Sequence, residues 1–166
     1  MALEATVYVG IKAEQTTTLD LGGGTIAIGP NDTKITLENG TATGQASKIF
    51  SDQRTLAASA TESLDLAASL VDALGSTLTF ATIKAIYIKA SADNTNDVIV
   101  GGAASNAFYG PFDAADNTVQ VKPGGAMLLV APKTGWAVTA STADILKIAN
   151  SAGTTGVTYD VVLVGT

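Results

Sequence analysis

Apolar and polar residues alternate in short runs along most of the chain. The clearest run is residues 83–90, where odd-numbered positions from Ile83 to Lys89 are expected to share one face and even-numbered positions from Lys84 to Ala90 the other. A period of two places successive side chains on opposite faces of an extended strand. This pattern predicts a β-strand rather than a helix.

Similar runs recur from Lys48 onward at intervals of about ten residues, a spacing typical of β-sandwiches and barrels. We predict strands at residues 98–100, 107–112, 118–121, 126–131, 136–139, 145–149 and 157–164. The glycine-containing segment 150–156 is suited to join the last two strands as a hairpin.

The amino-terminal part has its own strand patterns, at residues 6–11, 25–28 and 34–37. The turn residues Gly-Pro-Asn-Asp at positions 29–32 separate the last two and predict a small hairpin system. Residues 38–47 are small and polar without apolar periodicity, which predicts a hinge or linker. We therefore divide the chain into an amino-terminal β arm or small subdomain, residues 1–46, and a β-sandwich, residues 47–166.

Residues 59–74 fit two local structures. Ser59 and Glu62 form a capping-box pattern ahead of apolar residues at helical spacing, which favours a helix. Leu64 and Leu66, however, flank Asp65 in strand alternation, and a long helix among short strands would need a docking face of its own. We predict a strand at residues 62–68 followed by a helical turn at residues 70–74.

Composition supports a sheet protein with covered surfaces. The chain has 166 residues, enough for one domain or one domain plus an arm. Hydrophobic residues make up 46% and charged residues 14%, and 17 glycines are available for tight turns between short strands. The low charge suggests that other subunits cover much of the surface.

The charge and the cysteine count limit the possible partners. The net charge is −6 and the nine basic residues are scattered singly, so we expect neither nucleic acid nor an anionic membrane to be a partner. The chain has no cysteine, which excludes disulfides and thiolate metal sites. The absence of a signal-like amino terminus and of a membrane-length apolar run predicts a soluble protein made in the cytoplasm.

The residue types argue against catalysis. The chain has neither histidine nor cysteine, so Ser-His-Asp and Cys-His arrangements are impossible. Two carboxylate pairs, Asp113 with Asp116 and Glu62 with Asp65, are conceivable acid-base pairs for a glycosidase or lyase. Hydrated turns or strand edges explain them better. We therefore expect no enzyme and no catalytic residues.

Metal and cofactor sites are also not predicted. Residues 91–97 collect oxygen-bearing side chains that superficially suit calcium, but the sixth and twelfth positions counted from Asp93 are Val98 and Ala104 rather than the glycine and glutamate of an EF-hand. The loop is better explained as a polar turn. Glycines 22–24 and 101–102 lack the pattern of a phosphate-binding loop.

Aromatic residues are few and suggest packing. Trp136 and Tyr109 are the candidates for stacking on a sugar ring, although core or interface anchoring is the favoured interpretation. Phe80, Phe108 and Phe112 are assigned to packing.

Five segments carry a resemblance to a known group of proteins. They are residues 47–56, 83–88, 121–125, 144–151 and 159–165. Their succession of strands and turns, over roughly the last two thirds of the chain, resembles tailed-bacteriophage virion proteins encoded among head genes. The resemblance implies a fold similar to jelly-roll capsid decoration or cement proteins: an antiparallel β-sandwich, here with an amino-terminal β-hairpin arm.

The resemblance also implies a function. A decoration protein of this kind would form a homotrimer, bind the major capsid protein lattice on the outer surface of the virion and brace the head, with the arm reaching a neighbouring subunit. The alternative is a tail-fibre or receptor-binding β-sandwich that recognises a surface glycan. Neither function requires catalytic, metal-binding or cofactor-binding residues.

Overall fold

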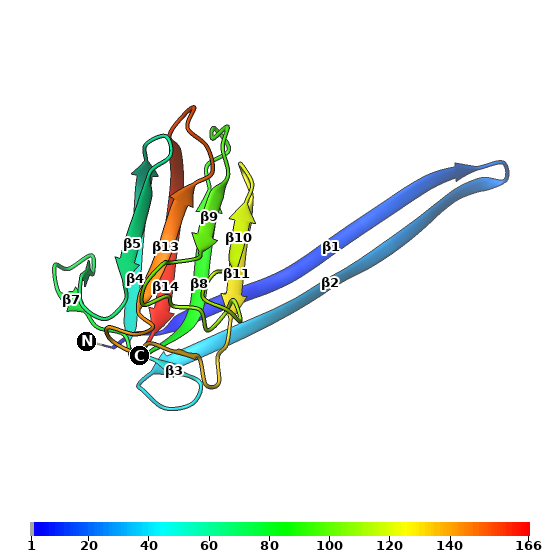
Figure 1. The fold of residues 1–166 in the computed structure, drawn as a ribbon. Coiled ribbons are helices and arrows are strands. Elements are labelled where there is room, and N and C mark those ends of the chain that lie inside the picture. Colours follow the sequence, from blue (N-terminus) through cyan, green and yellow to red (C-terminus); the bar gives the residue numbers. More distant parts are fainter. Residues whose placement is uncertain (1) are drawn as a thin grey trace.

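The computed structural model describes residues 2–166, which form strands and loops and no helix. Figure 1 shows two parts, a sandwich of two packed sheets and a long two-stranded ribbon that projects away from it. The beginning of the described chain and its carboxy-terminal end both lie at the end of the sandwich from which the ribbon departs (Figure 1). The predicted all-β fold with an antiparallel sandwich is confirmed. Within the described residues, no helix could span a membrane.

Each sheet of the sandwich contains four principal strands. The first sheet has the order β10 (Thr118–Val121), β9 (Val98–Gly101), β13 (Ile145–Asn150) and β5 (Thr61–Asp65). The second sheet, called here the arm-side sheet, has the order β11 (Ala126–Val130), β8 (Thr82–Ala90), β14 (Val157–Gly165) and β4 (Lys48–Leu56), and β12 (Trp136–Ala137) also pairs with β8.

The eight principal strands pair in a nested order. The first pairs with the last, β4 with β14, and working inward β5 pairs with β13, β8 with β11 and β9 with β10, all antiparallel. Except for β9 and β10, successive strands therefore lie in opposite sheets. The predicted hairpin across residues 150–156 is wrong for this reason, since β13 and β14 belong to different sheets. Asn150 fixes this crossing by donating from Nδ2 to the carbonyl oxygens of Ala57 and Thr155, at 3.0 and 2.7 Å.

The hydrophobic core fills the space between the two sheets. Alternate residues of β8 and β14 enter it, among them Ile86, Ile88, Val161 and Leu163, all fully buried. The face assignment predicted for β8 is wrong at one end, because the register shifts beside Val164 and turns Ile83 into the core as well.

The strand predicted at residues 107–112 is wrong. Residues 107–112 make only a single bridge, from Ala107 to Ile145, and form a loop. The side chains of Phe108 and Phe112 are buried in the core and anchor that loop. The packing role predicted for them, and for the equally buried Phe80, is confirmed.

The ambiguous segment 59–74 forms a strand and then a small hairpin. A strand was predicted at residues 62–68, and the structure has β5 there, which ends at Asp65; Leu64 and Leu66 are buried. The predicted helical turn is wrong, because β6 (Leu70–Val71) pairs with β7 (Thr77–Leu78). Asp72 closes the turn between them by accepting the amides of Leu74 and Ser76 at its Oδ1, at 2.9 and 2.8 Å.

The ribbon consists of β1 (Ala5–Leu19) and β2 (Gly22–Asn39), and β3 (Gln45–Ala46) pairs parallel with the end of β2. The two strands predicted at residues 25–28 and 34–37 are one continuous strand. The segment predicted as a turn between them, residues 29–32, lies inside β2 at an irregularity in its pairing with β1. The chain reverses instead at Asp20 and Leu21, at the tip (Figure 1).

Candidate functional site

The ribbon has one apolar and one polar face. Residues that pair across the two strands share a face, and the pairs on one face are Ala5 with Leu37, Val7 with Ile35, Val9 with Thr33, Ile11 with Asn31, Ala13 with Ile28 and Gln15 with Ile26. The intervening pairs are mostly polar, for example Tyr8 with Lys34 and Thr16 with Thr25. The apolar side chains of both strands therefore line one side of the ribbon.

An extra residue in β2 keeps this face continuous. Between the pairs Ile11–Asn31 and Ala13–Ile28, β1 has one residue and β2 has two, Gly29 and Pro30. A strand that gains one residue shifts its side chains to the other face. In β2 the shift is needed because the distal isoleucines are at even positions, 26 and 28, and the basal Ile35 and Leu37 at odd ones.

Gly29 fits this bulge because its backbone has a φ of +86°, where residues with a side chain are rare. A Cβ at this position would lie 2.6 Å from both the carbonyl oxygen of Ile11 and the amide nitrogen of Asn31. The backbone conformation therefore requires glycine at the bulge, where the side chains of β2 shift from one face to the other.

The apolar face is buried at its base and exposed further out. Leu37 is fully buried, whereas Ile11 is 67% and Ile26 is 68% exposed. Val9 and Ile28 are also exposed on this face, and Leu21 is fully exposed at the tip. We call the exposed part, Val9, Ile11, Ala13, Ile26 and Ile28, the distal apolar face. The sequence prediction missed it because the pattern changes phase at Gly29 and Pro30.

The base of the ribbon packs on the outer surface of the arm-side sheet. Leu37 and Ala46 form a second buried cluster with Ala85 of β8 and Val164 of β14. Leu3, Ala5, Val7, Val130 and Val162 pack against this cluster. Leu3 also donates its amide to Oδ1 of Asn39, at 3.0 Å. The same apolar face of the ribbon therefore packs on the sandwich at the base and is exposed to solvent further out.

A groove lies beside this attachment. The outer surface of the arm-side sheet forms its floor, with Tyr87, Leu128 and Val162 among the lining residues, and the start of β1 forms one wall. Its volume is about 460 Å³, and Glu4 is the one charged residue among those that line it. The groove is therefore a mainly apolar surface that the chain's own ribbon borders.

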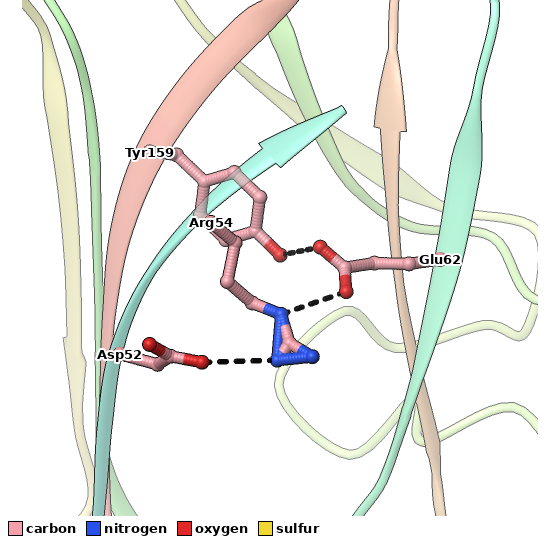
Figure 2. Close-up of polar contacts among 4 residues, drawn as sticks. All are labelled: Asp52, Arg54, Glu62 and Tyr159. Atoms are coloured by element: carbon pink, nitrogen blue, oxygen red, sulfur yellow. Dashed lines mark hydrogen bonds and ion pairs between the residues drawn. The ribbon is translucent and has the colours of Figure 1, made fainter. Parts of the chain in front are cut away.

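A polar cluster joins the two sheets at the edge formed by β4 and β5 (Figure 2). Arg54 of β4 donates from Nε to Oε2 of Glu62 in β5, at 2.8 Å, and from Nη1 to Oδ2 of Asp52, at 3.2 Å. The hydroxyl of Tyr159, from β14, donates to the other oxygen of Glu62. Both carboxylate oxygens of Glu62 are therefore engaged within the cluster.

The chemistry of this cluster suits a structural tie. Burial raises the pKa of the Tyr159 phenol, and the hydrogen bond to Glu62 raises it further. The phenol is therefore kept neutral as a hydrogen-bond donor. Since the Glu62 carboxylate accepts from both Tyr159 and Arg54, the cluster connects one sheet to the other through charge-assisted hydrogen bonds.

The carboxylate pair Glu62 and Asp65 is not brought together. The two residues are three positions apart in β5, so they lie on opposite faces of the strand. Asp65 instead accepts the amides of Ala67 and Ala68 at its Oδ1, at 2.9 and 3.0 Å. This carboxylate holds the turn that follows β5.

Asp113 and Asp116, the other pair, both lie exposed in the loop that follows Phe112. Among the described residues, no group of three or more Asp, Glu, His or Cys side chains is placed to hold a metal ion.

The oxygen-rich loop of residues 91–97 uses its side chains within the protein. Asn94 exchanges two hydrogen bonds with the backbone of Thr158, at 2.8 and 2.9 Å. Buried Asn96 donates to Oδ1 of Asn150 at 3.0 Å, and Asp97 pairs with Lys122 at 2.6 Å. The loop connects β8 in one sheet with β9 in the other, and its polar groups hold that crossing in place.

The two aromatic residues considered for glycan stacking differ in exposure. Tyr109 is about half exposed, whereas Trp136 is partly buried and packs against the core. Gly110 lies directly on Trp136, because a Cβ at Gly110 would be 2.9 Å from the Trp136 Cβ. Trp136 is therefore an anchor for the loop that carries Tyr109.

The sequence was also compared with known proteins. No protein-family model matches the chain, and no curated protein is significantly similar to it.

Proposed function

We propose that this protein is a structural subunit of a tailed-bacteriophage virion, a decoration protein that associates with copies of itself and braces the outer surface of the capsid. The observation that carries the proposal is the projecting ribbon, whose distal apolar face has no partner within the described chain. A two-stranded ribbon alone is only marginally stable in water, so a ribbon of this length is expected to be covered by another molecule.

The strand order supports the jelly-roll part of the proposal. A jelly roll is a fold of two packed sheets with two Greek keys. The first half of the chain pairs antiparallel with the second half, and this long hairpin folds over so that its strands form both sheets. The nested pairing from β4–β14 inward to β9–β10 follows that arrangement.

The surface chemistry supports assembly through broad contacts. Each capsid offers many equivalent positions, and a symmetric trimer that contacts several at once binds more tightly than one subunit, through effective concentration. The side chains of the described sites, from the Arg54 cluster to the Asn96 network, are engaged in holding the fold. We therefore assign the function of the chain to the contacts that its surfaces make with other subunits and with the capsid.

The proposal is tested by co-sedimentation with capsids of the phage that encodes the chain, purified without it. We expect saturable binding at a fixed number of copies per capsid and greater resistance of the bound capsids to heat. Capsids that neither bind the protein nor gain stability would contradict the proposed function.

The second candidate is the receptor-binding module, favoured by one observation, the exposed Tyr109 on a loop anchored by Trp136. Binding on a glycan array that Tyr109→Ala abolishes would support this candidate over the decoration function.

A further inference from the structure

We infer that the distal apolar face of one chain docks into the groove on the arm-side sheet of a second copy. This inference rests on the proposed function, because it identifies the contact by which the subunits assemble. The two surfaces of that contact are the distal apolar face of the ribbon, which includes Val9 and Ile28, and the groove floor at Tyr87, Leu128 and Val162.

The ribbon already contacts the outer surface of the arm-side sheet within its own chain. At its base the apolar face of the ribbon packs on Ala85 and Val164, on the outer surface of the arm-side sheet. The sheet surface continues as the groove, and the ribbon face continues as the distal apolar face. The ribbon face and the sheet surface therefore pack against each other at the base of the ribbon. Beyond the base, both of these surfaces are uncovered.

The direction and length of the ribbon suit a contact with a neighbouring chain. The ribbon leaves the sandwich and extends away from it, so its distal part is remote from the groove of its own chain (Figure 1). The distal apolar face lies along residues 9–15 of β1, which span about 20 Å at about 3.3 Å per residue, and a four-stranded sheet is about 15 Å across at about 4.8 Å between strands. The distal apolar face is thus long enough to cross the sheet of a neighbouring sandwich.

The distal apolar face and the groove match in chemistry. The distal apolar face has no charged side chain, and the groove has one, Glu4 at its border. Branched aliphatic side chains on a ribbon and a flat apolar sheet are suited to pack closely without leaving a charge unpaired. Apart from Glu4, neither surface offers a charge to a charged ligand.

A lipid surface fits these observations less well. The polar face of the distal ribbon carries both signs of charge, Lys12 and Glu14, and the whole chain has a net charge of −6. Ribbons and helices that lie on membranes typically carry clustered cations and aromatic anchors. The distal ribbon has neither, so a second copy is the better occupant.

The proposed contact is heterologous, because the ribbon of one subunit meets the groove of the next. Each subunit then gives one ribbon and receives one, and the contacts can close into a ring such as the expected trimer. Closure would leave every ribbon and every groove covered.

Single cysteines test the contact, because the natural chain has none and each introduced thiol is the sole one in its chain. The test pair is Ile28→Cys on the ribbon and Leu128→Cys in the groove, mixed as two separate full-length variants under mild oxidation. The matched control replaces Ile28→Cys by Ala27→Cys, the adjacent residue, which lies on the opposite face of the same strand. A disulfide requires the two Cα atoms to approach within about 7 Å.

We expect the mixed Ile28→Cys and Leu128→Cys chains to form the disulfide-linked pair with about tenfold higher yield than the control pair. Equal yields, or no linked pair in a sample that is oligomeric by light scattering, would overturn the inference and leave the proposed function standing. A sample that remains monomeric would overturn both.

Two further readouts separate the other occupants. Linkage of Ile28→Cys chains mainly to each other would show that ribbons pair with ribbons and would overturn the groove contact. Binding of the natural chain to phosphatidylcholine vesicles, abolished by Ile28→Ser, would assign the distal apolar face to lipid. Absence of vesicle binding, together with the linked pair, is the expected result.

Discussion

At the scale of single residues, Glu62 is the centre of the tie between the two sheets. It accepts from Arg54 and Tyr159, and its side chain is 20% exposed. Since charge-assisted hydrogen bonds in partly buried positions are stronger than surface ion pairs, Glu62→Gln should lower the free energy of unfolding by about 1–3 kcal/mol. The measurement is urea unfolding followed by fluorescence.

The matched control for this prediction is Asp52→Asn. Asp52 contacts the same Arg54, but its side chain is 48% exposed, so its loss should cost less than about 0.5 kcal/mol. Equal effects of the two substitutions would show that the cluster is a solvated ion-pair network and not a tie.

Tyr159 should make the fold sensitive to alkaline pH. Burial and the Glu62 hydrogen bond raise the pKa of its phenol, so the folded chain keeps this proton at a pH where the unfolded chain releases it. The free energy of unfolding should therefore fall as pH rises above the ordinary tyrosine pKa of about 10. Urea unfolding at several pH values should show a shallower fall for Tyr159→Phe.

The control is Tyr109→Phe, at an exposed position. This variant should keep the pH dependence of the natural chain. If Tyr159→Phe and the natural chain lose stability in parallel above pH 10, the alkaline sensitivity comes from other groups.

At the scale of elements, the bulge in β2 determines whether the ribbon has a continuous apolar face. Gly29→Ala would place a Cβ 2.6 Å from two backbone atoms and strain a φ of +86°. We expect the distal ribbon to lose amide protection in hydrogen exchange, while the sandwich strands keep theirs because the bulge lies outside the core.

Gly23→Ala is the control, because the atom nearest to its Cβ would be the carbonyl oxygen of Thr17, at 3.6 Å. It should leave the protection of the ribbon unchanged. Loss of protection in both variants would mean that the ribbon tolerates no added side chain anywhere, and the special role of Gly29 would be wrong.

The strands could be predicted wherever one alternation was strong, and the pairing between them could not. β8 and β14 were predicted with nearly correct bounds because buried apolar residues recur at every second position over most of each strand, from Ile86 to Ala90 in β8 and from Val157 to Leu163 in β14. Residues 107–112 were predicted wrongly because Phe108 and Phe112 are apolar for another reason, as anchors of a loop. Likewise, Asn150 to Gly156 has the composition of a hairpin loop, but the sheet that each flanking strand joins depends on distant partners.

The candidate site was predictable only in part. The sequence indicated an amino-terminal arm, but it hid the arm's apolar face, because Ile26 and Ile28 are out of phase with Ile35 and Leu37 until the bulge is taken into account. The cluster of Arg54, Glu62 and Tyr159 joins residues up to 105 positions apart in the chain, and no local pattern indicates such a contact.

At the scale of the whole molecule, the sandwich is expected to fold without the distal ribbon but to depend on its base. The base buries Leu37 and Ala46 against Ala85 and Val164. A shortened arm that replaces residues 9–33 by Asn-Gly would close the hairpin at the paired Tyr8 and Lys34 and keep this contact. Its thermal midpoint should remain close to that of the natural chain, by differential scanning calorimetry.

The central claim is that the chain works by assembling through the distal ribbon. The most direct measurement is the mass in solution, by light scattering after size exclusion, of the natural chain and of the shortened-arm variant at equal concentrations. We predict a trimer of 16.6 kDa chains for the natural protein and a folded monomer for the variant. A natural chain that is monomeric at high micromolar concentration, or two proteins with the same oligomeric mass, would contradict the claim.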